Sequence, residues 1–152
     1  MSDSVTVRPA RPDDAETLVA FNRAMAEESE DKGLDTAVLR RGVDYLLTHP
    51  QDGFYLMAER GGEVAGTLMV TYEWSDWRAG RFWWIQSVYV LPAHRRGGVY
   101  RAMHAHVREQ AMADAEACGL RLYVERDNSG AMATYRSRGM DETHYRLYEE
   151  EF

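Results

Sequence analysis

The chain has 152 residues, of which 45% are hydrophobic and 28% are charged, and this predicts one globular domain over residues 1–152. Its net charge of −7 argues against a nucleic-acid-binding protein, because such a protein needs a basic surface. No apolar run reaches the ~20 residues that span a membrane, and the single cysteine, Cys118, excludes an intrachain disulfide, so a cytoplasmic protein is expected.

Apolar periodicity and turn signals predict alternating strands and helices in the first half of the chain. Helices are expected after Pro12 and after Asp35, and Pro50 ends the second of them. Gly61 and Gly62 predict a tight turn between two strands. The strands expected in this half cover residues 5–8, 54–59 and 64–74.

The second half continues this alternation. A strand over residues 82–90 precedes a helix over residues 98–117, which would place Cys118 at a helix end. A strand over residues 120–124, a helix that begins at Ser129 and a last strand over residues 144–148 complete the order. The expected fold is α/β of the α+β type, with a mixed, mostly antiparallel sheet and helices on both faces.

The most informative segment covers residues 86–103 and reads QSVYVLPAHRRGGVYRAM. A strand, a glycine turn and a helix start follow one another here, which leaves backbone N–H groups without partners at the helix start. The helix dipole adds partial positive charge at the same place. The segment therefore predicts a site for a phosphate-type anion, formed by Arg95, Arg96, Gly97, Gly98, Val99, Tyr100 and Arg101.

The same segment resembles the acetyl-CoA signature of the GNAT N-acetyltransferase superfamily. In that signature Val-x-Pro ends a strand and Arg/Gln-x-x-Gly-x-Gly/Ala opens a helix. Val90 and Pro92 match the first part, and Arg95 and Gly98 match the second. Tyr100 stands where the family usually has a small residue. This departure leaves the anion-binding donors in place, because they are backbone groups.

A second segment resembles the other cofactor-binding segment of the family. Asn128 stands where the family has an asparagine that meets the pantetheine arm of the cofactor. Tyr135, seven residues later, stands where the family has a tyrosine that protonates the leaving thiolate. The alternative interpretation of Tyr135 is an aromatic side chain packed in the core. The likeness covers roughly residues 63–139.

The resemblance implies a site between two strands. The strand that ends at Val90 and the strand that begins at Leu120 would splay apart, and the pantetheine arm would pair with the main chain of Val88 and Val90. A backbone N–H near Val88 would polarise the thioester carbonyl. The implied activity is direct transfer of an acetyl group from acetyl-CoA, the co-substrate, to a small primary amine. A peptide or protein amine as acceptor, and a non-catalytic acyl-CoA sensor, are the alternatives.

The general base is not evident from the sequence. Many family members have a carboxylate on the strand before the glycine turn, whereas residues 82–86 of this chain read FWWIQ. Glu73 and Glu28 are the nearest carboxylates by topology, and each is also typical of a solvated surface acid. A chain of water molecules that carries the proton to bulk solvent is an equal alternative.

Aromatic residues flank the hairpin before the glycine turn. Tyr72, Trp74 and Trp84 are interpreted as one wall of the acceptor site, where aromatic faces receive a cationic amine, or alternatively as core and edge packing. The aromatic hairpin and the exposed strand edges also predict a homodimer.

Histidine spacing and loop chemistry narrow the class of ligand. His104 and His106 would point to nearly opposite sides of a helix, and no other histidine has a partner at ligand spacing, so no metal site is expected. The glycine turn lacks Gly-Lys-Ser/Thr and Gly-x-Gly-x-x-Gly, which argues against a nucleotide-binding module.

Overall fold

The computed structural model describes residues 4–30 and 33–152. Its chain divides into two compact units, Met1–Leu122 and Tyr123–Phe152. The first unit holds a five-stranded sheet with three helices, and the second holds one helix and the C-terminal segment. The single domain expected over residues 1–152 remains a prediction.

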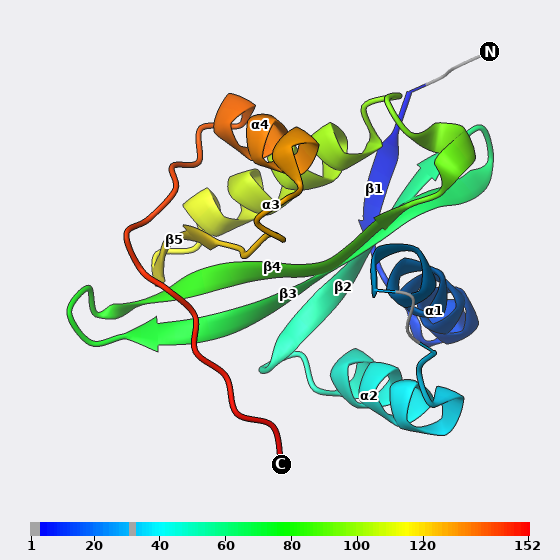
Figure 1. Cartoon of the computed structure of the whole chain (residues 1–152), viewed down its shortest axis with the longest axis horizontal. Coiled ribbons are helices and arrows are strands. Elements are labelled where there is room, and N and C mark those ends of the chain that lie inside the picture. Colours follow the sequence, from blue (N-terminus) through cyan, green and yellow to red (C-terminus); the bar gives the residue numbers. More distant parts are fainter. Residues whose placement is uncertain (1–3, 31–32) are drawn as a thin grey trace. The chain divides into compact units, whose positions relative to one another are not determined.

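The sheet has its strands in chain order, which are β1 (Thr6–Pro9), β2 (Gly53–Arg60), β3 (Glu63–Ser75), β4 (Gly80–Val90) and β5 (Ala117–Arg121). The first three pairings are antiparallel and the pairing of β4 with β5 is parallel. A mixed, mostly antiparallel sheet is therefore confirmed (Figure 1).

Helices cover both faces of this sheet, as the sequence predicts (Figure 1). On one face α3 (Val99–Ala113) packs against alternate strand residues such as Leu56. On the other face α1 (Ala15–Glu30) and α2 (Thr36–Thr48) pack against the intervening strand residues, such as Met57, whose side chains point the other way. Successive strand side chains point to opposite faces, so one strand contributes to both cores.

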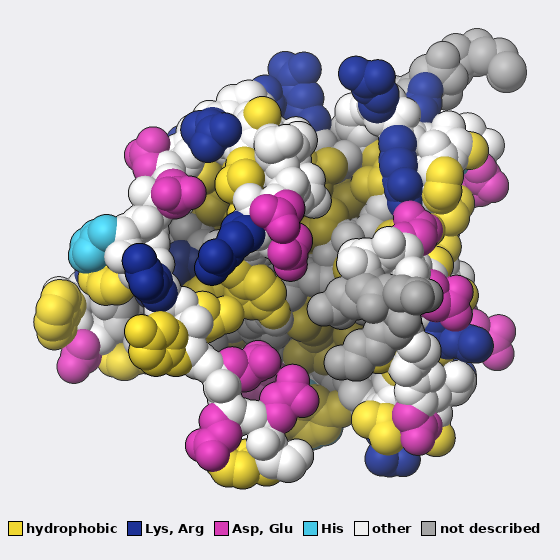
Figure 2. All heavy atoms as spheres, viewed as in Figure 1, with side chains coloured by type: hydrophobic (Ala, Val, Ile, Leu, Met, Phe, Trp, Pro, Cys, Tyr) yellow, Lys and Arg dark blue, Asp and Glu magenta, His cyan; other side chains and the backbone are white. Residues whose placement is uncertain are grey.

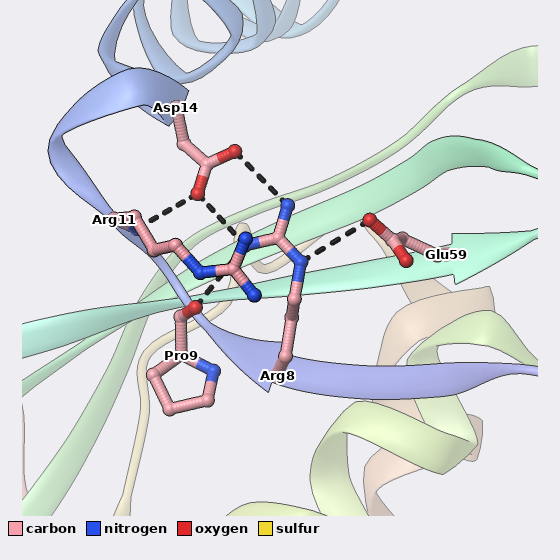
Figure 3. A network of polar contacts seen from close by, with 5 residues as sticks. All are labelled: Arg8, Pro9, Arg11, Asp14 and Glu59. Carbon is pink, nitrogen blue, oxygen red and sulfur yellow. Dashed lines mark hydrogen bonds and ion pairs between the residues drawn. The ribbon is translucent and has the colours of Figure 1, made fainter.

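Arg8 fixes the first turn of the chain to the sheet (Figure 3). Its guanidinium donates to both carboxylate oxygens of Asp14, at 2.8 and 3.0 Å, and to Glu59 on β2 at 3.1 Å. Asp14 also accepts the backbone N–H of Arg11 at 2.7 Å, at the start of the short 3-10 turn Pro12–Asp14. The Arg8 guanidinium lowers the pKa of Asp14 and ties β1, the turn and β2 together.

The boundary between α3 and β5 corrects the prediction. The helix ends at Ala113, four residues before the expected end, because Asp114 has extended backbone and its side chain accepts the N–H of Glu116 at 3.0 Å. This aspartate turn starts a new strand at Ala117. Cys118 consequently lies on β5, beside Gly80 of β4, and not at a helix end.

The second unit contains α4 (Ser129–Ser137). Asn128 caps this helix, because its side-chain oxygen accepts the N–H of Ala131 at 3.0 Å. The strand predicted over residues 144–148 is wrong: none of these described residues is in a strand, and Tyr148 is 88% exposed. A strand has no hydrogen bonds of its own, so alternating apolar residues form one only where a neighbouring strand is available.

No helix among residues 4–30 and 33–152 is long and apolar enough to cross a membrane.

Candidate active site

The edge of β4 that faces β5 is paired over only part of its length. The parallel pairing begins at Arg81 and Ala117 and stops at Trp84 and Arg121. We call this last pair the fork. Within the described part of the chain, residues 85–90 of β4 have no strand on that side. Strand β5 ends at the same pair, so the splayed strands that the family resemblance implies remain a prediction. The free edge of β4 exposes main-chain groups to which a ligand can bind.

A β-bulge lies on this free edge. Opposite Leu68 of β3, β4 places two residues, Ser87 and Val88, and Ser87 has a left-handed φ of 51°. The extra residue reverses the alternation of side chains between the two faces of the sheet. As a result Ile85 before the bulge and Val88 after it both pack against the core on the α3 side. The bulge thus re-aims the backbone around Val88, where the sequence predicts the polarising N–H.

The glycine loop, which we define as residues 95–101, runs from the end of η2 (Pro92–His94) into the first turn of α3. Gly98 is the N-cap residue of α3 and has a φ of 82°, and Arg96 has a φ of 64°. Both values are left-handed; Gly98 adopts this conformation without strain, whereas Arg96 is a non-glycine residue in it. The N–H groups of the first turn, from Val99 onward, have no intrahelical partner and carry the positive end of the helix dipole. The predicted anion site therefore has the local geometry it needs.

The Arg95 side chain is occupied within the protein. Its Nε donates to the carbonyl oxygen of Val90 at 2.9 Å, and its Nη2 donates to Glu28 of α1 at 2.6 Å. Val90 is one of the residues expected to pair with the pantetheine arm, and this contact uses one of the two lone pairs of its carbonyl. Arg95 thus ties the glycine loop to β4 and α1 through its side chain.

Glu28, one of the two expected bases, lies in a cluster with Tyr89 and Arg95, which we call the Glu28 cluster. Its carboxylate accepts the Tyr89 hydroxyl and the Arg95 guanidinium, and the Tyr89 ring also contacts Phe21 edge-on at 5.4 Å. The Tyr89 hydroxyl and, next, the Arg95 guanidinium lower the pKa of Glu28.

Glu73, the other expected base, lies at the fork. Its Oε1 accepts the Trp84 Nε1–H at 2.9 Å and Arg121 Nη1 at 2.8 Å, and the Arg121 guanidinium lies over the Phe82 ring at 3.7 Å. We call these four residues the Glu73 cluster. The hydrogen bond from Trp84 is the main cause that lowers the pKa of Glu73, and Arg121 adds to it. Both carboxylates are therefore ionised and weakly basic at neutral pH.

The three aromatic residues expected to form one wall do not lie together. Tyr72 packs with Trp83 and Phe54 against the α3-side core, at ring distances of 5.6 and 6.5 Å. Trp84 points to the opposite face, where it meets Glu73. Trp74 is 61% exposed near the end of the hairpin. The core-packing interpretation therefore holds for Tyr72. Of the three aromatic residues, Trp84 is the one that lies at the fork.

Tyr100, the departure from the family signature, points along its own helix. Its hydroxyl lies 3.1 Å from Nδ1 of His104, and the two rings meet edge-on at 5.7 Å. His104 is 2% exposed and belongs to the buried part of α3. The large side chain is thus accommodated beside the next turn of the helix.

Cys118 bears on whether a covalent intermediate forms. It lies beside Gly80, at the opposite end of β4 from Val88. Eight residues of strand correspond to about 26 Å. The helix-end position that argued against a covalent intermediate is thus replaced by one on β5 that is also far from Val88.

In the second unit, Asn128 and Tyr135 stand at the first and last turns of α4. The Asn128 oxygen is used to cap the helix, which leaves the amide N–H groups for a ligand. Burial raises the pKa of Tyr135 above its usual value, so its hydroxyl is protonated at neutral pH. A protonated hydroxyl is the state that a general acid requires.

Sequence reasoning missed the bulge at Ser87 and the partners of both carboxylates. Nothing in the local sequence distinguishes Ser87 from other strand residues, because a bulge is defined by the strand opposite. Tyr89 and Arg121 alternate with core residues in their strands. This alternation predicts on which face of the sheet each side chain lies, but not which residue it contacts.

A family model described as the acetyltransferase (GNAT) family matches residues 16–140. The chain belongs to this family. Its members transfer acetyl groups and use acetyl-CoA as the donor. A solved structure from Clostridium difficile 630, described as a possible acetyltransferase, is 42% identical, has a TM-score of 0.90 and is matched over 97% of each chain.

Two curated relatives of this GNAT chain are named mycothiol acetyltransferase. The protein from Corynebacterium aurimucosum is 29% identical over 83% of the chain, and that from Mycolicibacterium gilvum is 30% identical over 85%. In both cases the chain spans 42% of the length of the relative.

Proposed function

We propose that this chain catalyses acetyl transfer from acetyl-CoA to a primary amine of a small molecule. The observation that carries the proposal is the free edge of β4, with its bulge at Ser87, leading directly into the glycine loop. The pyrophosphate would lie on the N–H groups of residues 97–101, and the pantetheine arm would extend along Val88 and Val90. The family, and relatives named for acetylation of the small molecule mycothiol, support the acceptor class.

The proposed reaction is a direct attack. The amine nitrogen forms a bond to the thioester carbon, the carbon–sulfur bond breaks, and the thiolate takes a proton. The N–H of Val88 stabilises the negative charge that develops on the carbonyl oxygen. Both Glu28 and Glu73 are held by cationic and N–H or O–H donors, so we propose that water, and neither carboxylate, carries the amine proton to solvent.

Tyr135 is the proposed source of the proton for the leaving thiolate. Tyr135→Phe removes one oxygen, so the fold and the affinity for CoA should change little. Turnover should fall about 100-fold, the usual scale for a positioned general acid. The loss should appear in kcat more than in KM for acetyl-CoA, because the proton is needed only as the carbon–sulfur bond breaks.

The experiment measures acetyl-CoA-dependent thiol release with a panel of small amines and short peptides, on wild-type protein and on Tyr135→Phe. Calorimetry with CoA and a melting curve on the same preparations serve as controls. Wild-type turnover in the variant would overturn the role of Tyr135. Tight binding of acetyl-CoA without thiol release by any amine would instead indicate an acyl-CoA sensor.

A cytoplasmic location and a homodimer belong to the same proposal. The single cysteine favours a reducing compartment. Trp74 and Trp77, which are 61% and 87% exposed at the end of the β3–β4 hairpin, are the residues we would place in a dimer interface.

A further inference from the structure

One arginine at the glycine loop lies outside the family signature. Arg60 is the last residue of β2, and its guanidinium lies against Gly97. A Cβ atom at position 97 would stand 2.9 Å from Arg60 Cζ, so the close approach requires glycine there. The β2–β3 turn therefore brings a positive charge to the loop from a part of the chain 37 residues earlier (97 minus 60).

The guanidinium of Arg60 differs from that of Arg95 in its bonding. Arg95 donates two of its five N–H groups, one to the Val90 carbonyl and one to Glu28. Within the described residues, neither a hydrogen bond nor an ion pair holds Arg60, although its side chain is half-buried. A half-buried guanidinium whose five donors lack protein partners is suited to bind an anion, and phosphate accepts its paired N–H groups well.

We propose that Arg60 binds a phosphate group of CoA, while Arg95 positions the loop through Glu28. The inference rests on the proposed function, because it takes CoA as the ligand of the glycine loop. CoA offers two sources of phosphate at this end of the molecule, the pyrophosphate and the 3′-phosphate.

The surroundings of Arg60 favour an anion. Arg96 and Arg101 are exposed on the same loop, and neither has an ion pair in the part of the chain that the structure describes. Arginine side chains lie along the upper right edge of Figure 2, on the side where Figure 1 shows the turn between β4 and α3. On a chain with a net charge of −7, this local excess of positive charge attracts a polyanionic cofactor.

The experiment is calorimetry with CoA and with 3′-dephospho-CoA at two ionic strengths, on wild type, Arg60→Met, Arg60→Lys and Arg41→Met. Arg41 is an exposed arginine of α2, so its variant controls for the loss of one charge. Arg60→Met should bind CoA roughly tenfold more weakly, or worse, and with a shallower dependence on salt. Arg60→Lys should recover part of the affinity, because it keeps the charge but not the paired donors.

The two nucleotides distinguish the two phosphates. If Arg60 binds the 3′-phosphate, the loss in Arg60→Met disappears with 3′-dephospho-CoA. If it binds the pyrophosphate, the loss persists with both. Gly97→Ala tests the geometry independently, because its methyl group should displace the guanidinium. It should weaken CoA binding more in the wild-type background than in Arg60→Met, where only its 3.2 Å approach to the His94 carbonyl oxygen remains.

Arg60→Met with the affinity and salt dependence of Arg41→Met would overturn the proposal for Arg60 alone. A wild-type protein that bound no CoA, or a Gly98→Asp variant that bound it as well as wild type, would overturn the proposed function with it. Melting curves of all variants exclude a loss of affinity that comes from unfolding.

Discussion

The two ends of the free segment of β4 are built from the same chemistry. At the fork, Glu73 accepts from an aromatic N–H of Trp84 and from Arg121. After the bulge, Glu28 accepts from the Tyr89 hydroxyl and from Arg95. Each carboxylate thus meets one aromatic donor and one guanidinium. The elements that they connect differ.

The Glu73 cluster joins three neighbouring strands, whereas the Glu28 cluster joins a helix, a strand and the glycine loop. The Glu73 cluster links β3, β4 and β5 at the point where the β4–β5 pairing stops. The Glu28 cluster holds the glycine loop, which we propose binds the cofactor. The segment between the two clusters, with its unpaired edge, is therefore anchored at both ends. A carboxylate close to the proposed site can thus be held by structural contacts, which is why we propose that neither glutamate is the base.

Of the two clusters, the Glu28 cluster is expected to give the larger effect. Arg95→Met leaves the Val90 carbonyl and Glu28 without their donor, so the glycine loop loses its ties to β4 and α1. We expect CoA to bind about tenfold more weakly, with the salt dependence of wild type, because Arg95 orders the loop and does not face the phosphate. Calorimetry at two ionic strengths measures both quantities.

Glu28→Gln is the matched variant for this prediction, because it removes the other partner of the same contact. The effects of the two substitutions should not add when they are combined. A shallower salt dependence in Arg95→Met would show that Arg95 contacts a phosphate directly, and the difference between Arg95 and Arg60 would then disappear.

Substitution of either carboxylate is expected to have a smaller effect, which is on turnover. Glu73→Gln and Glu28→Gln should each lower kcat at saturating acetyl-CoA by less than tenfold, because a carboxylate with a lowered pKa is a weak base. Removal of a true general base typically costs 100-fold or more. A loss of that size in one variant, with a pH profile that loses its acidic limb, would identify that glutamate as the base.

The smallest effect is on stability at the fork. Glu73→Gln should lower Tm by about 1–3 °C at pH 7, since the pair with Arg121 is partly exposed. The folded protein lowers the pKa of Glu73, so its contribution is present above the usual glutamate value of about 4.3 and is lost as the pH falls through the lowered value.

Melting curves at pH 7 and at pH 3 test this dependence. The difference between wild type and Glu73→Gln should shrink at the lower pH. A difference that grew as the pH fell would contradict the lowered pKa.

The order of strands and helices could largely be predicted from the sequence, because apolar periodicity and capping residues act over a few positions. Asp35 shows this, since its side chain accepts the N–H groups of Ala37 and Val38 at the start of α2. The errors arose where a boundary depends on more than periodicity. The end of α3 depended on the turn at Asp114, and the strand expected over residues 144–148 lacked a neighbour.

The candidate site was predictable to the same extent. The glycine loop follows from a strand, a turn and a helix that are contiguous in sequence. The free edge of β4 depends on where β5 ends, and only the family resemblance implied it. The roles of side chains were less predictable: Arg95 fits the family signature but its guanidinium is used inside the protein, and Tyr72 fits an aromatic wall but packs in the core. A residue type indicates which bonds a side chain can make, and not which partner reaches it.

The sequence by itself determined the turn that we propose binds an anion, because glycine at position 98 and the helix that follows leave N–H groups unpaired through local geometry alone. Only the tertiary structure decided which arginine faces that turn. Glu28 reaches Arg95 from 67 residues away, and Arg60 reaches Gly97 from another strand. These contacts depend on how the sheet and the helices pack. They cannot be predicted from the spacing of residues within a short segment.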